Sequence, residues 1–166
     1  MTPSALIARA RSALGRKVVY RLGAGGMAPK SVGPEGSDGA CDCSGYVAWA
    51  LGISRQTNDP FYLHVMGGWI NTTAIVADAK DPSGLFTRIA NPKPGCLILY
   101  AAGSSGRANG HVGIVTTVID NAPVQVIHCA SGNFKRTGDA IQETHPGAFT
   151  IPGVIFAWYD ALEVEP

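Results

Sequence analysis

Charged residues are scarce in this sequence, and neither sign dominates. Asp, Glu, Lys and Arg make up 15% of the 166 residues, and the formal net charge is +1. Proteins that bind nucleic acids present a basic surface to the phosphates, often interleaved with aromatic side chains. No such cluster is present here, so we expect no nucleic-acid partner.

Long apolar runs are also missing. No stretch approaches the roughly 20 apolar residues that cross a bilayer, so we expect no membrane span. Residues 1–4 lack the basic and apolar regions that open a secretory signal peptide. We therefore expect a protein that is cytoplasmic or is exported by a non-classical route.

Cysteine is sparse as well, with four residues at positions 41, 43, 96 and 129. Their number and spacing do not form a dense disulfide framework, so we expect free thiols. Zinc is a rival explanation for the Cys and His residues, but Cys-x-Cys is not the usual zinc spacing. His128 and Cys129 are also neighbours on an expected strand and would point to opposite faces. We expect no metal and no other cofactor.

Apolar residues, in contrast, make up 46% of the chain, enough for a substantial core, and the length suits one domain over residues 1–166. Thr2 and Pro3 are typical of a helix start, and apolar residues recur with helical spacing as far as Leu14. A second helix is expected over residues 72–80. The glycine-rich segment 23–39 is expected to form a loop.

Cys43 is placed where a third, short helix should begin. Asp42 or Cys43 can serve as its N-cap, and Gly52 ends the apolar run that follows. The helix dipole and the free N–H groups of the first turn stabilise a thiolate. We therefore predict that Cys43 is a nucleophile with a pKa below the usual value of about 8.5.

The second half of the chain is rich in β-branched residues. Strands are expected over residues 96–101, 111–119, 124–129 and 151–159, and the pair Asp120-Asn121 can form a hairpin turn because both residues tolerate positive φ. Short connections favour an antiparallel sheet, and the helices before it make the class α+β. Three aromatic residues of the intervening segment could line a groove or simply belong to the core: Phe61, Tyr62 and Trp69.

The hairpin register brings two histidines together. A two-residue turn at positions 120–121 places His111 opposite Ala130. Because side chains alternate along a strand, His128 then shares a face with His111 and is its diagonal neighbour. This register predicts that His128 can hydrogen-bond to His111 and orient it as a base for Cys43.

In this order the motifs resemble the NlpC-type family of papain-like cysteine peptidases, which cut cell-wall peptides. The matching pieces are Asp-Cys-Ser-Gly at 42–45, Gly-His-Val-Gly-Ile at 110–114 and Ile-His-Cys-Ala at 127–130. Weaker matches are Tyr-Arg-Leu-Gly at 20–23 and Lys-Pro-Gly-Cys-Leu at 93–97, where Cys96 replaces the acidic residue that the family usually has.

The resemblance implies a papain-like fold, with N-terminal helices packed on an antiparallel sheet, and hydrolysis through a thioester acyl-enzyme. In that chemistry Cys43 is the nucleophile, His111 the general base and His128 the residue that orients it. The family pattern places the Tyr20 hydroxyl beside the oxyanion. It also implies that Asp42 and Ser44 contact a free amine of the substrate peptide.

The implied substrate is a cell-wall stem peptide, cut near the bond between D-glutamate and the diamino acid. The alternatives are a CHAP-type peptidoglycan amidase with the same Cys and His logic, an acyltransferase, and a non-catalytic binding module on the same fold. Three biological roles fit such a hydrolase: a bacterial wall-degrading factor, a phage wall-degrading factor and an exported toxin. A delivery apparatus or targeting partner could bring the protein to the wall.

Overall fold

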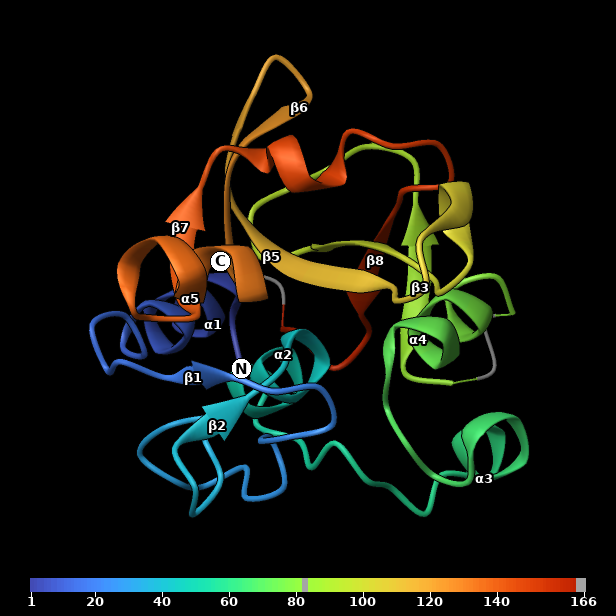
Figure 1. Cartoon of the computed structure of the whole chain (residues 1–166). Helices are drawn as coiled ribbons and strands as arrows, with labels where there is room; N and C mark the ends of the chain where they lie inside the picture. Colours follow the sequence, from blue (N-terminus) through green and yellow to red (C-terminus); the bar gives the residue numbers. More distant parts are fainter. Residues whose placement is uncertain (82–83, 164–166) are drawn as a thin grey trace.

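A six-stranded antiparallel sheet forms the centre of the computed structural model, which describes residues 1–81 and 84–163 (Figure 1). The strand order across the sheet is β3-β8-β4-β5-β6-β7. The strands are β3 (Phe86–Ile89), β4 (Leu97–Tyr100), β5 (His111–Ile119), β6 (Ala122–Cys129), β7 (Ile141–Thr144) and β8 (Ile155–Tyr159).

The helices belong mostly to the first half of the chain. They are α1 (Pro3–Arg11), α2 (Cys43–Ala50), α3 (Pro60–Met66), α4 (Thr72–Asp78) and α5 (Ser131–Thr137), with 3-10 turns η1 (Ser104–Gly106) and η2 (Pro146–Phe149). Two short parallel strands, β1 (Val19–Tyr20) and β2 (Ala40–Cys41), pair before α2. The predicted α+β class, with N-terminal helices on an antiparallel sheet, is confirmed.

The β5–β6 hairpin has the predicted turn. Both turn residues, 120–121, have positive φ values of 50° and 59°, and Ile119 pairs with Ala122. A local irregularity interrupts the ladder, after which Ile114 pairs with Ile127 in the same register. The turn therefore fixes which face of each strand points to the helices.

Side-chain caps define the first two long helices. Thr2 accepts a hydrogen bond from the Ala5 N–H at 3.2 Å, with Pro3 at the first helical position, as the sequence predicts. Asp42 caps α2 by accepting from the Gly45 N–H at 2.8 Å. These caps satisfy N–H groups that have no partner within the helix, and so they set where each helix starts.

The sheet is buried on both faces, which explains why β4 is continuously apolar and why β5 is buried over its first six residues. Helices α1, α2 and α4 pack on one face around Tyr46, Trp49 and Ile75. The segment containing η2 covers the other face and buries Phe149 with Tyr100. Among the described helices, none has the length and apolar character of a membrane-crossing segment.

Several elements differ from the sequence expectations. Helix α3 was not expected, although Asp59 caps it, Pro60 opens it and Gly67 ends it in the left-handed region. Strands β3 and β7 and helix α5 were not expected either. They are short segments whose pairing or packing depends on the rest of the fold. The single-domain interpretation stays a prediction, and residues 82–83 and 164–166 of it lie outside the described residues.

Candidate active site

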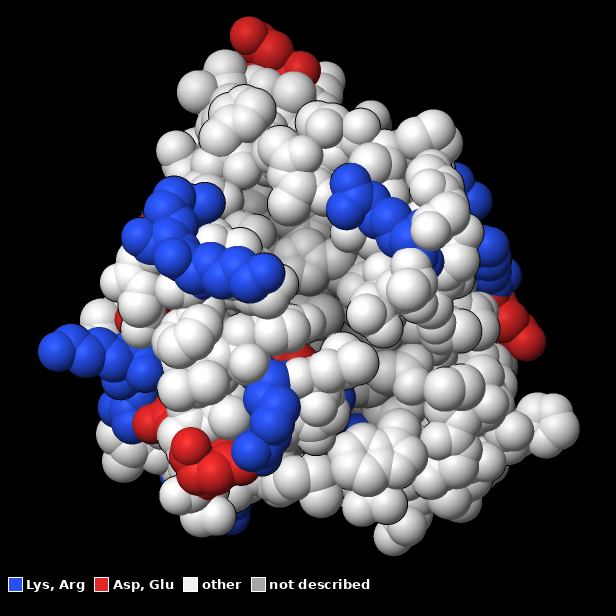
Figure 2. All heavy atoms as spheres, in the orientation of Figure 1, with Lys and Arg blue, Asp and Glu red and all other residues white. Residues whose placement is uncertain are grey.

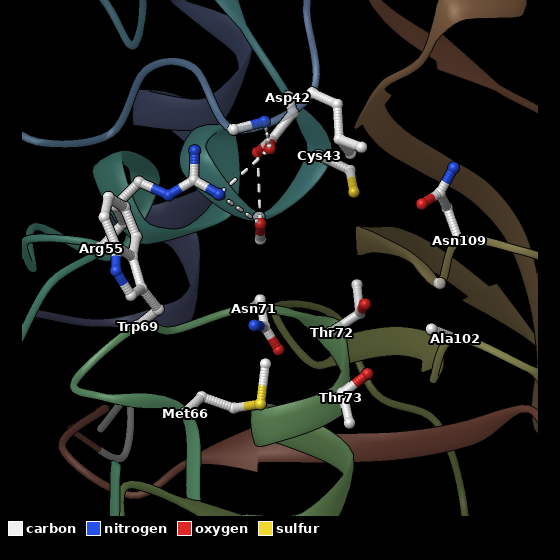
Figure 3. A pocket seen from close by; sticks show the side chains of 14 residues that line it. Asp42, Cys43, Arg55, Met66, Trp69, Asn71, Thr72, Thr73, Ala102 and Asn109 are labelled. Carbon is white, nitrogen blue, oxygen red and sulfur yellow. Dashed lines mark hydrogen bonds and ion pairs between the residues drawn. The ribbon is translucent and has the colours of Figure 1, made fainter. Parts of the chain in front are cut away.

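Cys43 is the first residue of α2, and its thiol lines a cleft on the surface (Figure 3). Its side chain is only 3% exposed, because the helix is buried on all sides. The first-turn N–H groups of an α-helix have no acceptor within the helix, so those of Cys43 and Ser44 are available at the cleft. The predicted place of Cys43, at a helix start, is confirmed.

Gly45 explains part of the motif around Cys43. A Cβ atom at this position would overlap the backbone of Ala24 and Gly25. Glycine therefore allows the loop before β2 to lie directly against the first turn of α2. The contact is reinforced by the Asp42 N–H, which donates to the Ala24 carbonyl at 3.0 Å.

The structure brings the two predicted histidines together. His111 opens β5 and His128 is near the end of β6, and their Nε2 and Nδ1 atoms are 2.7 Å apart. The His111 ring is stacked on Phe149, with centroids 5.0 Å apart and planes at 16°. His128 Nε2 is 3.0 Å from the Thr144 hydroxyl. The diagonal placement predicted from the hairpin register is confirmed.

Both imidazoles are kept neutral by their surroundings. Burial, and then the charge of His128, lowers the pKa of His111 to about 3. Burial, and then the charge of Arg136, lowers the pKa of His128 to about 4. At neutral pH each ring therefore carries one N–H and has one free lone pair.

The expected low pKa of Cys43 is contradicted. Burial, followed by the Asp42 carboxylate, raises the pKa of the Cys43 thiol to about 12. The backbone N–H groups of Val112 and Ser44, and the Arg55 charge, lower it but do not compensate. The helix dipole favours the thiolate, but the loss of hydration on burial outweighs it. The thiol and both imidazoles are therefore uncharged at rest.

The Cys43 thiol lies against the backbone at the start of β5, and it has no hydrogen bond to His111 among the described residues. The thiol lies at the N–H of Val112, the residue after His111. Within residues 1–81 and 84–163, the His111 ring has one hydrogen-bond contact, from Nε2 to His128 Nδ1, and so its Nδ1 atom has no partner there. Catalytic hydrogen bonds often tighten only when substrate is bound, so this geometry is compatible with proton transfer.

Tyr20 lies close to this centre, as the sequence suggested. It pairs with Cys41 across the β1–β2 ladder and is half-buried. Burial, and then the nearby Cys43, raises the pKa of Tyr20. Its hydroxyl therefore remains protonated at neutral pH and can donate a hydrogen bond.

Asp42 and Ser44 belong to a buried polar cluster centred on Arg55. One Asp42 oxygen accepts from Gly45 N–H and the Ser44 hydroxyl, and the other from Gly23 N–H at 2.6 Å and Arg55 at 3.0 Å. Arg55 also donates to the Ser44 hydroxyl at 3.0 Å. The Asp42 charge is thus neutralised by Arg55 and its lone pairs are occupied, which differs from a carboxylate that awaits a substrate amine.

The cleft beside Cys43 has a volume of about 490 Å³. In Figure 3 the Cys43 sulfur points into it, and Arg55 lies above Trp69 on one wall. The Arg55 guanidinium is 5.4 Å from the centre of the Trp69 ring. Polar side chains of Asn71, Thr73 and Asn109 line other parts. Of the three aromatic residues that could have formed a groove, Trp69 lines the cleft and Tyr62 is core.

Cationic side chains flank this face of the molecule. Figure 2 shows Lys and Arg atoms on both sides of the hollow at its centre. Arg107 lowers the pKa of His111 and Arg136 lowers that of His128, so both guanidinium groups lie near the histidines. Two positive charges, Arg107 and Arg136, therefore lie near the histidine pair.

The remaining cysteines are buried and free. Cys41 and Cys129 are in the helix-side core, where the Cys129 thiol is 3.4 Å from the Cys41 carbonyl oxygen. Cys96 lies in the core on the other face, and burial raises its pKa to about 11. No group of three or more His, Cys, Asp or Glu side chains in the described ranges could hold a metal ion.

Three residues of the site were not found from the sequence: Arg55, Thr144 and Phe149. Arg55 stands in an irregular segment, and a single arginine there carries no signal for a buried ion pair. Thr144 could have been found only by extending the register argument to β7, which was not expected to be a strand. Phe149 belongs to a 3-10 turn, whose position depends on tertiary packing.

Comparison with protein-family profiles matches residues 34–133 to the CHAP domain. This range includes Cys43, His111 and His128 and covers more than half of the chain, and it corresponds to the related alternative named above, not to the NlpC family itself. A search among curated proteins found no match. CHAP domains are typically peptidoglycan hydrolases. On the extent of this match, the chain belongs to the CHAP domain family.

Proposed function

We propose that the protein is a cysteine-dependent peptidoglycan hydrolase that cuts an amide bond through a thioester acyl-enzyme. The observation that carries this proposal is the arrangement of Cys43, His111 and His128. A thiol at the first turn of α2 lies beside the backbone of β5, and His111 at the start of β5 is held by His128 at 2.7 Å. Nucleophile, base and orienting group are the parts that acyl transfer requires.

The raised pKa of Cys43 and the lowered pKa of His111 define the order of proton transfer. Because the resting pair is neutral, His111 removes the thiol proton as the sulfur attacks the amide carbon. The C–N bond then breaks, and His111 gives the proton to the leaving amine. Water, deprotonated by His111, attacks the thioester and releases the acid and the thiol.

The oxyanion formed in each step needs hydrogen-bond donors that are already in place. The first-turn N–H groups of Cys43 and Ser44 are suited to this role, since the positive end of the α2 dipole is at the same point. The protonated Tyr20 hydroxyl is a third donor near the sulfur. Removing one such donor typically costs about 10²–10³ in kcat.

Two bonds of the cell-wall polymer are candidates. One is the bond between D-glutamate and the diamino acid, which the NlpC resemblance implies. The other is the amide that joins the peptide to the glycan, which amidases cut. Asp42 is neutralised by Arg55 and accepts from four donors, so it offers no free carboxylate to a peptide amine. This pairing favours the amidase bond, whose acyl side carries no free amine.

Mass spectrometry of muropeptides after digestion of purified peptidoglycan identifies the bond. Released glycan free of peptide indicates the amidase reaction, and shortened stem peptides indicate the peptidase reaction. The Cys43→Ala protein is the matched control, because it deletes the sulfur and little packing. Turnover by this variant, or no new product from the wild type, would contradict the proposal, and the second result would favour a binding module.

A further inference from the structure

A chain of hydrogen bonds continues beyond the two histidines to the backbone of β7. His111 Nε2 is 2.7 Å from His128 Nδ1, and His128 Nε2 is 3.0 Å from Thr144 Oγ1. The Thr144 hydroxyl is in turn 3.1 Å from the carbonyl oxygen of His145. The chain therefore links the base to a group that can only accept a hydrogen bond.

The last acceptor fixes the direction of every bond in the chain. A hydroxyl has one hydrogen, and a carbonyl oxygen cannot donate, so Thr144 donates to His145 and must accept from His128 Nε2–H. A neutral imidazole has a single N–H, so His128 Nδ1 is then bare and accepts from His111 Nε2–H. His111 Nδ1 is left with a free lone pair.

The opposite direction would disable the site. If Thr144 donated to His128 Nε2, the His128 hydrogen would be on Nδ1 and would point at His111 Nε2. His111 would then have its hydrogen on Nδ1 and could not accept the thiol proton there. The two arrangements use the same heavy-atom positions and differ only in which ring nitrogens hold hydrogen.

We propose that Thr144 is a positioning residue that sets the tautomers of His128 and His111, so that His111 Nδ1 is the basic nitrogen of the site. This inference rests on the proposed role of His111 as the base for Cys43. Thr144 acts through His128 and does not touch the substrate.

The sheet holds Thr144 in this place. His128 pairs with Gln142 across the β6–β7 ladder, and Thr144 pairs with Val126. Thr144 is therefore the diagonal cross-strand neighbour of His128 on the same face, just as His128 is the diagonal neighbour of His111. One register thus aligns three polar side chains on adjacent strands. Both rings are neutral because both are buried.

The test compares Thr144→Val, which keeps the side-chain shape, with Thr144→Ser, which keeps the hydroxyl. We expect T144V to lower kcat on peptidoglycan by about 10- to 100-fold, the loss that is typical when a group that orients a metal-binding histidine is removed, with KM little changed. T144S should retain most of the activity. Thr150→Val is the matched control, since its exposed hydroxyl donates only to the Gly147 carbonyl.

A direct readout is the tautomer itself, measured without substrate. Long-range proton–nitrogen spectra of histidine-labelled protein should show His111 with a bare Nδ1 and His128 with a protonated Nε2 in the wild type and in T144S. In T144V the His128 signals should shift toward the other tautomer or an average of both. These spectra also show whether the variant is folded.

Two results would overturn the inference: a wild-type His111 protonated on Nδ1, or T144V with unchanged kcat and tautomers. Its failure is distinct from failure of the proposed function. If Cys43→Ala is inactive and T144V is fully active, only the role of Thr144 is lost. If Cys43→Ala is active, the hydrolase mechanism itself is wrong, whatever the spectra show.

Discussion

The buried histidines should make the protein sensitive to mild acid. In the unfolded chain a histidine has a pKa of about 6.5, whereas in the fold His111 and His128 titrate near 3 and 4. Below pH 6.5 the unfolded state therefore binds protons that the folded state does not. The free energy of unfolding must fall as pH falls, until the folded histidines themselves become protonated.

The size of the loss follows from proton linkage. A group that is charged only in the unfolded state changes the stability by about 1.4 kcal/mol per pH unit. Two such histidines, mostly protonated in the unfolded chain between pH 6 and 5, give a loss of about 2 kcal/mol over that unit. Glu35 and Glu143, whose pKa values lie below 4.5, contribute only at lower pH. Burial raises the pKa of Asp78, so Asp78 binds a proton more readily in the fold and opposes the loss. The contribution of the histidines is therefore isolated by comparing the wild type with histidine variants.

Urea unfolding followed by tryptophan fluorescence at pH 6 and pH 5 measures this loss. The variant His128→Gln should lose about half of the pH effect, and His111→Gln/His128→Gln nearly all of it. His64→Gln/His145→Gln is the matched control, because both of those side chains are exposed and both buried histidines remain. An equal loss in the wild type and in the His111/His128 double variant would refute the argument.

Three further predictions concern the site. His111→Ala should lower kcat by about 10²-fold or more, and His128→Ala by less, because His128 only orients the base. Iodoacetamide should label Cys43 ahead of the other thiols, since it lines the cleft, and the rate should rise about tenfold per pH unit above neutrality because the pKa is near 12. Arg55→Met should destabilise the fold by about 3–5 kcal/mol, since Asp42 is left buried without its partner.

Each of these has an outcome that contradicts it. If steady-state kinetics show that His128→Ala leaves kcat unchanged, His128 has no role in the mechanism. A labelling rate that is already maximal near pH 6 would mean that Cys43 is a thiolate at rest. Thermal unfolding of Arg55→Met should be compared with Arg88→Met, an exposed arginine in β3. Equal stability of the two variants would mean that the buried ion pair between Asp42 and Arg55 adds little to the free energy of unfolding.

Local patterns predicted the parts of the fold that local forces control. The caps at Thr2 and Asp42 and the turn at 120–121 depend on side chains and φ preferences within a few residues, and all are found as expected. The turn also fixed the His111–His128 pair, because its register carries along the whole hairpin. Motif and register together were thus enough to place His128 beside His111.

Effects that depend on the whole fold could not be predicted from the sequence. The direction of the Cys43 pKa shift was wrong because burial of α2 on all sides is a tertiary property. The ion pair between Asp42 and Arg55 joins segments that no periodic pattern relates. Thr144 could not be predicted because it lies in β7. This strand has only four residues and is too short to be recognised by alternation alone.

The two histidines lie on interior strands of the sheet, which limits how far they can move in the folded protein. β5 lies between β4 and β6, and β6 between β5 and β7, so each has hydrogen-bonded neighbours on both sides. Interior strands exchange their amide hydrogens with solvent mainly through global unfolding. The amides of Ile114 and Ile127 should therefore be among the slowest to exchange. The His111–His128 pair should then keep its geometry for as long as the protein is folded. If His111 is the base, we expect differences in rate between substrates to originate in the cleft wall, which loops and the ends of α2, α3 and α4 form.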